Sequence, residues 1–186
     1  MTGSKDIKTE SKRKFHINPV TRFVLIFLIS ILIISIGFSQ LFTRYHDNFL
    51  WLMDSTASIC GWTMSIFTDQ VSYSDRFITY NGFPVEIIDE CTGLFEVLIY
   101  LAAVLSFSTS IRNKSIGLLM GIPAIYLFNI IRIIMLLIAG SYSQRAFDFL
   151  HLYLWQVILI IMISTVWVGW LYLVVYREKR SKNISA

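Results

Sequence analysis

Three residues of reactive type lie at or near the ends of apolar segments. Cys91 occurs in Asp-Glu-Cys-Thr-Gly, where a polar stretch gives way to an apolar run. Arg132 lies inside a later apolar run, and His151 begins the next one. A thiol, a guanidinium and an imidazole can supply the nucleophile, the oxyanion stabiliser and the base of acyl transfer. Whether they act together depends on the helices that carry them.

The apolar content of the chain predicts a membrane protein. The 186 residues are 55% hydrophobic, against about 45–50% in soluble domains, and the excess lies in runs of the length that crosses a bilayer. We expect an all-α integral membrane protein with about four transmembrane helices. Their approximate ranges are 23–42, 91–109, 115–139 and 149–176. They form one polytopic domain, 23–176, between basic tails at 1–22 and 177–186.

The basic residues predict the orientation. Six of the sixteen Lys and Arg precede the first span, two lie between the second and third, and four follow the last. Because positive charge gathers on the cytoplasmic side, both termini are expected in the cytoplasm of a multi-pass protein of the inner membrane. The acidic insert, residues 43–90, then faces out, and so does Cys91.

The insert has two recognisable parts. Apolar residues recur at spacings of three and four through 49–68, namely Phe49, Met53, Ala57, Cys60, Met64 and Phe67. This predicts an amphipathic helix on the membrane surface or against the bundle. The alternative, a spanning helix, would invert every later segment. Asn81-Gly82 between β-prone runs predicts a small outer β-hairpin, and Pro84 limits its second strand to an edge.

Cys91 is expected in the first turn of the second span. A helix N-terminus lowers the pKa of a thiol, whereas Asp89 and Glu90 oppose ionisation by repulsion. The alternative is an inert, buried cysteine that only packs. Cys60 on the apolar stripe is expected to pack, and a Cys60–Cys91 disulfide would block the nucleophile.

Polar residues accompany Arg132 and His151. Asn129 and Arg132 share a helix face, being three residues apart, and Glu96 is a candidate partner for an intramembrane arginine. Arg132 could instead extend to the interface, or serve only in that pair. Asp148 lies one turn before His151 and could orient its imidazole; the alternative is a structural histidine. The predicted topology brings Cys91, Arg132 and His151 to one depth.

These residues resemble a known pattern. Glu90-Cys91-Thr92-Gly93, then Asn129-x-x-Arg132, then a histidine at the start of the next span are similar to the exosortase/archaeosortase family of membrane transpeptidases. Thr92 replaces the serine of the usual Glu-Cys-Ser-Gly motif and keeps its hydroxyl. The resemblance covers about residues 83–176, as in a short member of the family. It implies Cys91 as nucleophile with Arg132 and His151 as catalytic partners, but does not reach Glu96 or Asp148.

The resemblance also implies a reaction. The protein would cleave C-terminal sorting signals, each a short motif, a transmembrane helix and a basic tail, from exported proteins at the outer membrane face. Through a Cys91 thioester it would pass them to a lipid or glycan acceptor, or to water. The alternative is a non-enzymatic transport or assembly subunit with a polar interior of Glu96, Asn129 and Arg132. No cofactor, metal site or nucleic-acid partner is expected, because the two cysteines form no metal-binding motif and the basic residues form no stripe.

Overall fold

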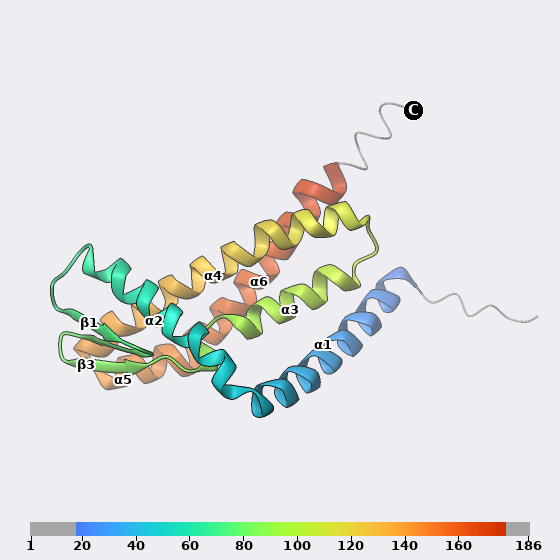
Figure 1. Ribbon diagram of the computed structural model, residues 1–186. Coiled ribbons are helices and arrows are strands. Elements are labelled where there is room, and N and C mark those ends of the chain that lie inside the picture. Colours follow the sequence, from blue (N-terminus) through green and yellow to red (C-terminus); the bar gives the residue numbers. More distant parts are fainter. Residues whose placement is uncertain (1–17, 178–186) are drawn as a thin grey trace, which may run out of the picture.

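The computed structural model describes residues 18–177, so the predicted tails at 1–22 and 177–186 lie almost wholly outside the described residues. Long helices lie side by side and lead away from a small sheet at one end (Figure 1). The helices are α1 (Pro19–Arg44), α2 (Leu50–Ser65), α3 (Leu94–Ser106), α4 (Ile111–Tyr142), α5 (Gln144–Phe149) and α6 (Trp155–Trp170). Short helical turns are η1 (His46–Phe49), η2 (Asp89–Cys91), η3 (Leu150–Leu154) and η4 (Leu171–Tyr176).

The predicted class, a helical membrane protein, is confirmed. Within residues 18–177, three helical stretches are long and apolar enough to cross a membrane: Pro19–Arg44, Ile111–Tyr142 and Gln144–Tyr176. The last is continuous because the π-helical turns η3 and η4 extend α6 at both ends. The second predicted span is shorter than expected. Its helix, α3, has 13 residues and rises about 20 Å, against the roughly 30 Å of a bilayer core.

The sheet has one strand more than the predicted hairpin. Strands β1 (Val71–Ser74), β2 (Phe77–Tyr80) and β3 (Phe83–Glu86) form an antiparallel meander in the order β1-β2-β3. The turn at Asn81 and Gly82 is confirmed, since their φ angles of 49° and 79° suit a tight hairpin. Pro84 does lie in an edge strand. β1 was not predicted. It pairs with β2 through a tight turn in which Asp75 has a positive φ of 50°.

The predicted amphipathic helix is α2. Met53, Ala57, Cys60 and Met64 are buried, as the stripe predicted. Phe67 lies beyond the helix and is 83% exposed. α2 packs against β1 and α4, and a Cβ on Gly61 would clash with the Tyr73 ring. α2 therefore belongs to the bundle, and among the described residues it is not one of the candidate spans.

The interior divides into two cores. The sheet-end core joins α2, the sheet, η2 and α4; its buried members are Met53, Ala57, Cys60, Met64, Ile78, Ile87, Cys91, Ile130, Ile133 and Leu137. The helical core joins α3, α4, α6 and η4; its buried members are Tyr100, Val104, Ile125, Leu159, Met162, Trp170, Leu171 and Val175. α1 borders α3 and contributes no buried residue.

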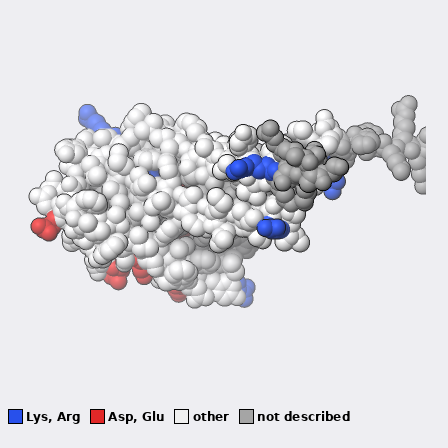
Figure 2. Space-filling view, turned by 90° about the horizontal axis from the view of Figure 1, so that it is seen from above, with Lys and Arg blue, Asp and Glu red and all other residues white. Residues whose placement is uncertain are grey.

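Charge separates along the long axis of the molecule. Asp and Glu gather over the end that carries the sheet, and most of the visible Lys and Arg lie toward the opposite end, where α1 begins and η4 ends (Figures 1 and 2). This polarity agrees with the positive-inside pattern of the sequence. Which side of a membrane the sheet faces stays a prediction.

Candidate active site

Cys91 lies in a 3₁₀ turn that ends before α3 begins. Thr92 Oγ donates to the Asp89 carbonyl at 2.6 Å and accepts from the Leu94 amide at 3.4 Å, so it ties the turn to the start of the helix. Gly93 separates the two in a left-handed conformation, φ +78°, which favours glycine. Cys91 was predicted to lie in the first turn of the helix. Because Gly93 is left-handed, α3 instead begins at Leu94, after Cys91.

Asn129 of α4 holds this turn in place. Its side chain is fully buried, and its Nδ2 donates to the Cys91 carbonyl at 2.6 Å. A Cβ on Gly93 would lie 3.2 Å from the Asn129 side chain, so glycine also permits the close approach. Arg132 Nη1 contacts Asn129 Oδ1 at 3.5 Å. The predicted shared face of Asn129 and Arg132 is thereby confirmed.

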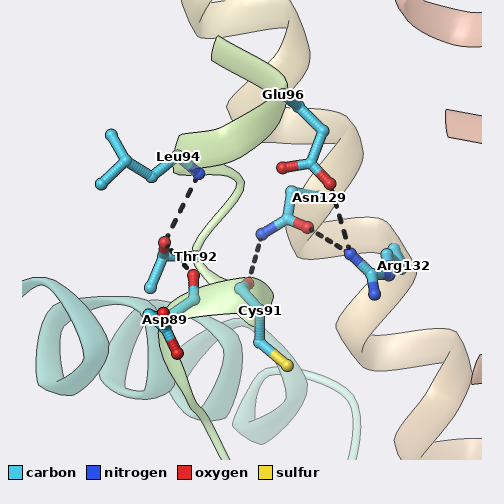
Figure 3. Close-up of polar contacts among 7 residues, drawn as sticks. All are labelled: Asp89, Cys91, Thr92, Leu94, Glu96, Asn129 and Arg132. Carbon is cyan, nitrogen blue, oxygen red and sulfur yellow. Dashed lines mark hydrogen bonds and ion pairs between the residues drawn. The ribbon is translucent and has the colours of Figure 1, made fainter. Parts of the chain in front are cut away.

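Arg132 also pairs with Glu96, as the sequence suggested. Nη1 lies 3.7 Å from Glu96 Oε1, and both side chains are about nine-tenths buried. Figure 3 shows Nη1 turned toward Glu96 and Asn129, while the Cys91 sulfur lies on the side of η2 that faces α4. Arg132 Nε and Glu96 Oε2 are buried without a hydrogen-bond partner. These two atoms are therefore the ones in the Arg132–Glu96 pair that no other described group engages.

His151 reaches the same place from the last helix. It and Cys91 both line a pocket of about 110 Å³ between β3, α4 and α5. The His151 imidazole stacks on the Phe147 ring, with ring centroids 5.4 Å apart and planes 5° apart. The Phe83 ring packs against Phe147 in turn, with centroids 5.4 Å apart. A residue that sequence reasoning missed, Phe147, therefore orients His151. Its spacing of four was the available signal.

Asp148 makes no hydrogen bond to His151, and its orienting role stays a prediction. Its Oδ1 accepts from Gln144 Nε2 at 2.9 Å, and His151 Nδ1 has no hydrogen-bond partner. His151 also lies within a continuous helix, in the π-helical turn η3, instead of at the start of a span. Ser143 alone separates α4, which runs to Tyr142, from α5, which begins at Gln144. π-Helical turns widen a helix locally and often occur at functional sites.

The surroundings of Cys91 oppose ionisation of its thiol. Burial raises the pKa of Cys91 above its usual value of 9.0; a backbone hydrogen bond at Ile88 and the Arg132 cation oppose this, and Glu90 and Asp89 add to it. Asp89 and Glu90 oppose ionisation, as predicted, and burial is the largest influence on the pKa of Cys91. Burial also raises the pKa of Cys60, to about 12. Both cysteines are free thiols.

Comparison with known proteins identifies the family. The family described as transmembrane exosortase (Exosortase_EpsH) matches residues 18–168, most of the chain. The chain belongs to the transmembrane exosortase family. No curated protein and no solved structure matched. Exosortases are membrane cysteine transpeptidases and proteases that act on exported proteins with C-terminal sorting signals. This exosortase is accordingly a multi-pass membrane protein.

Proposed function

We propose that this exosortase cleaves C-terminal sorting signals through a thioester on Cys91. One observation carries the proposal: Cys91 and His151 line one pocket although they come from distant parts of the chain. Arg132 lies beside the same turn, joined to the Cys91 backbone through Asn129. These are the groups that a cysteine acyl-transfer site needs.

In the proposed first step, His151 accepts the Cys91 thiol proton as the sulfur attacks the scissile carbonyl. A C–S bond forms, and the carbonyl oxygen becomes an oxyanion. Arg132 stabilises that charge through the N–H groups not engaged by Glu96 and Asn129; Nε is one that is free. The C–N bond then breaks, and His151 gives its proton to the leaving amine. The acyl part of the substrate remains on sulfur as a thioester.

The second step releases the thioester. An amine, a hydroxyl or water attacks the acyl carbon, the C–S bond breaks, and the Cys91 thiol re-forms with the proton of the incoming group. The raised pKa of Cys91 fits a thiol that is deprotonated only as it attacks, by a neighbouring base. Glu90, Thr92 and Asn129 support the turn that carries Cys91, and Glu96 sets the orientation of Arg132.

The transport or assembly alternative has less support. It requires polar groups that continue from Glu96 toward the opposite end of the bundle. The neighbouring helical core is apolar, and the Tyr100 hydroxyl within it is already bonded to the Gly117 carbonyl at 2.9 Å. The site at Cys91 is therefore closed on that side, as expected for a reaction centre at one face.

The cell of origin provides the test. Surface proteins from cells that express Cys91→Ala should keep their C-terminal helix and basic tail, whereas Cys60→Ala cells should process them normally. Mass spectrometry of C-terminal peptides shows whether the surface proteins have been cleaved. An immunoblot of membrane fractions checks that both variants insert into the membrane. Normal processing in Cys91→Ala cells would refute the proposal.

A further inference from the structure

The free edge of β3 leads directly to Cys91. β3 is the last strand of the meander, so one of its edges pairs with β2 and the other does not. The chain after β3 stays extended at Ile88, with φ −99° and ψ 173°, and then enters η2 with Cys91. An open strand edge therefore ends at the proposed nucleophile.

The register determines which backbone groups point outward. The Ile87 amide donates to the Arg76 carbonyl at 2.8 Å, so the backbone of residue 87 faces β2. Because hydrogen-bonding directions alternate along an antiparallel strand, the amides of Glu86 and Ile88 point away from β2. Pro84, on the same edge, has no N–H to offer. The edge thus presents two donors close to Cys91 and none at its far end.

A second copy of this chain is a poor occupant of the edge. Pro84 lies on it, and a proline is one of the usual means by which a protein prevents edge-to-edge pairing. The two donors near Cys91 suit a short segment instead. A peptide of two or three extended residues can pair with both.

The pocket beside the edge limits the side chain that can enter. Val85 to Ile88 form one wall, and Ile133, Leu136 and Phe147 face them. Its volume is about 110 Å³, smaller than the ~150 Å³ cavity that holds benzene. The lining is mainly apolar. The small volume favours an aliphatic side chain over an aromatic ring.

We propose that the substrate segment on the acyl side of the scissile bond binds as a short strand along the free edge of β3, with an aliphatic side chain in the pocket. The inference rests on the proposed function and adds the recognition mode, strand addition. The sheet lies at the end of the molecule away from most of the helical bundle (Figure 1). The acyl side therefore lies on the sheet, and the leaving side continues toward α3 and the bilayer.

Synthetic probes test the pocket without a known substrate. N-acetyl tripeptide chloromethyl ketones alkylate a thiol: sulfur displaces chloride, a C–S bond replaces the C–Cl bond, and the thiol proton passes to solvent. Valine or phenylalanine is placed at each position in turn, and labelling is followed by mass spectrometry on Cys60→Ala protein in detergent. At one position the valine probe should label Cys91 roughly tenfold faster than the phenylalanine probe. Leu136→Ala should reduce that preference, and equal rates at every position would overturn the pocket assignment.

Backbone methylation tests the added strand. Only every second amide of an added strand faces β3, so N-methylation of one probe amide should slow labelling about fivefold to tenfold, and methylation of its neighbour should not. Glu86→Pro, which removes an edge donor, should abolish this alternation, while the matched Glu86→Ala should keep it. Unchanged labelling of Glu86→Pro by iodoacetamide shows that its site is intact. No alternation in the parent protein, or alternation that survives Glu86→Pro, would overturn strand addition.

The two proposals fail in different ways. If Cys91→Ala blocks processing in cells but the probes show no alternation, strand addition is refuted and the proposed function stands. If Cys91→Ala cells process normally, the proposed function is refuted, and the inference falls with it whatever the probes show.

Discussion

The two cores of the molecule treat their buried polar groups differently. In the helical core, the deepest polar side chains donate to backbone carbonyls: Tyr100 to Gly117 at 2.9 Å and Trp170 to Asn113 at 2.8 Å. Beside the sheet-end core, Arg132 Nε, Glu96 Oε2 and His151 Nδ1 have no partner. The indoles of Trp155 and Trp167 are also unpaired, but they are neutral and cost less to bury.

This contrast indicates where the fold gives up stability. Each unpaired buried group costs about 1–3 kcal/mol, and charged groups cost more. In the helical core, aromatic rings lie directly against glycines, which places their polar atoms within reach of backbone carbonyls. A Cβ on Gly121 would clash with the Tyr100 ring. The sheet-end core has such unpaired atoms near Cys91, whose thiol is subject to the charges of Arg132, Glu90 and Asp89. The following predictions test whether that cost serves catalysis.

The largest expected effect separates the two thiols of the sheet-end core. Purified Cys91→Ala should lose roughly 10⁴-fold or more of its cleavage rate, the scale seen when a covalent nucleophile is removed. Cys60→Ala should retain the parent rate, because Cys60 is buried on α2 without a charged partner. Cleavage is measured on a substrate identified from the cell comparison. Equal losses in both variants would show that Cys91 only packs.

The second prediction separates two roles of Arg132: its ion pair with Glu96 stabilises the fold, and its guanidinium stabilises the oxyanion. Arg132→Gln should lower activity about 10²–10³-fold, as loss of an oxyanion donor does, and should destabilise the protein by about 3–5 kcal/mol by leaving Glu96 unpaired in its buried site. Adding Glu96→Gln should restore much of the stability, measured by thermal unfolding in detergent.

Activity is the control in that experiment. The double variant should remain as inactive as Arg132→Gln, because the guanidinium is still missing. If activity returned together with stability, Arg132 would be a structural residue, as one reading of the sequence allowed.

The third prediction uses glycines from both regions. Gly93→Ala should lower activity about tenfold to a hundredfold, since it opposes φ +78° and pushes Asn129 away from the Cys91 turn. Gly121→Ala should cost about 1–3 kcal/mol of stability by overpacking against Tyr100 and leave the activity of the folded fraction unchanged. Gly37→Ala, with no atom within 4 Å of the added Cβ, is the neutral control. Similar effects of the first two on activity would remove the distinction between the cores.

The smallest effect is a shift in pH dependence. Iodoacetamide labels the thiolate, so labelling of Cys91 should still rise with pH above the ordinary thiol pKa of 9.0, because burial raises the pKa of Cys91. The Arg132 cation lowers that pKa, so Arg132→Gln should move the labelling curve to higher pH. A curve that stayed in place would show that the guanidinium exerts no field at the sulfur.

The sequence predicted much of the frame. The apolar runs gave the long helices, the stripe through 49–68 gave α2, and Asn81-Gly82 gave the turn between β2 and β3. These features depend on local patterns with periods of 3.6 or 2 residues. The cluster of Glu96, Asn129 and Arg132 could also be predicted, because an arginine inside an apolar run requires polar partners and the apolar segments contain few of them.

What the sequence did not predict depends on tertiary geometry. Residue 93 had to be left-handed for Cys91 to precede α3, and the motif alone does not specify that conformation. Burial of Cys91, the largest influence on its pKa, depends on α4 and the sheet closing over η2. Asp148 was one turn from His151, but Gln144 competes for it on the exposed helix surface, and Phe147 stacks on the imidazole. β1 was missed because Val71–Ser74 carries little apolar character.

The central claim is that Cys91 carries the substrate as a thioester. Membranes from cells that express the parent protein are quenched in acid, digested, and analysed by mass spectrometry for the peptides that contain Cys91 and Cys60. The account predicts an adduct on Cys91 that hydroxylamine removes and whose mass matches the new C-terminus of a processed surface protein. Processed surface proteins without any adduct on Cys91, or with the adduct on Cys60, would contradict it.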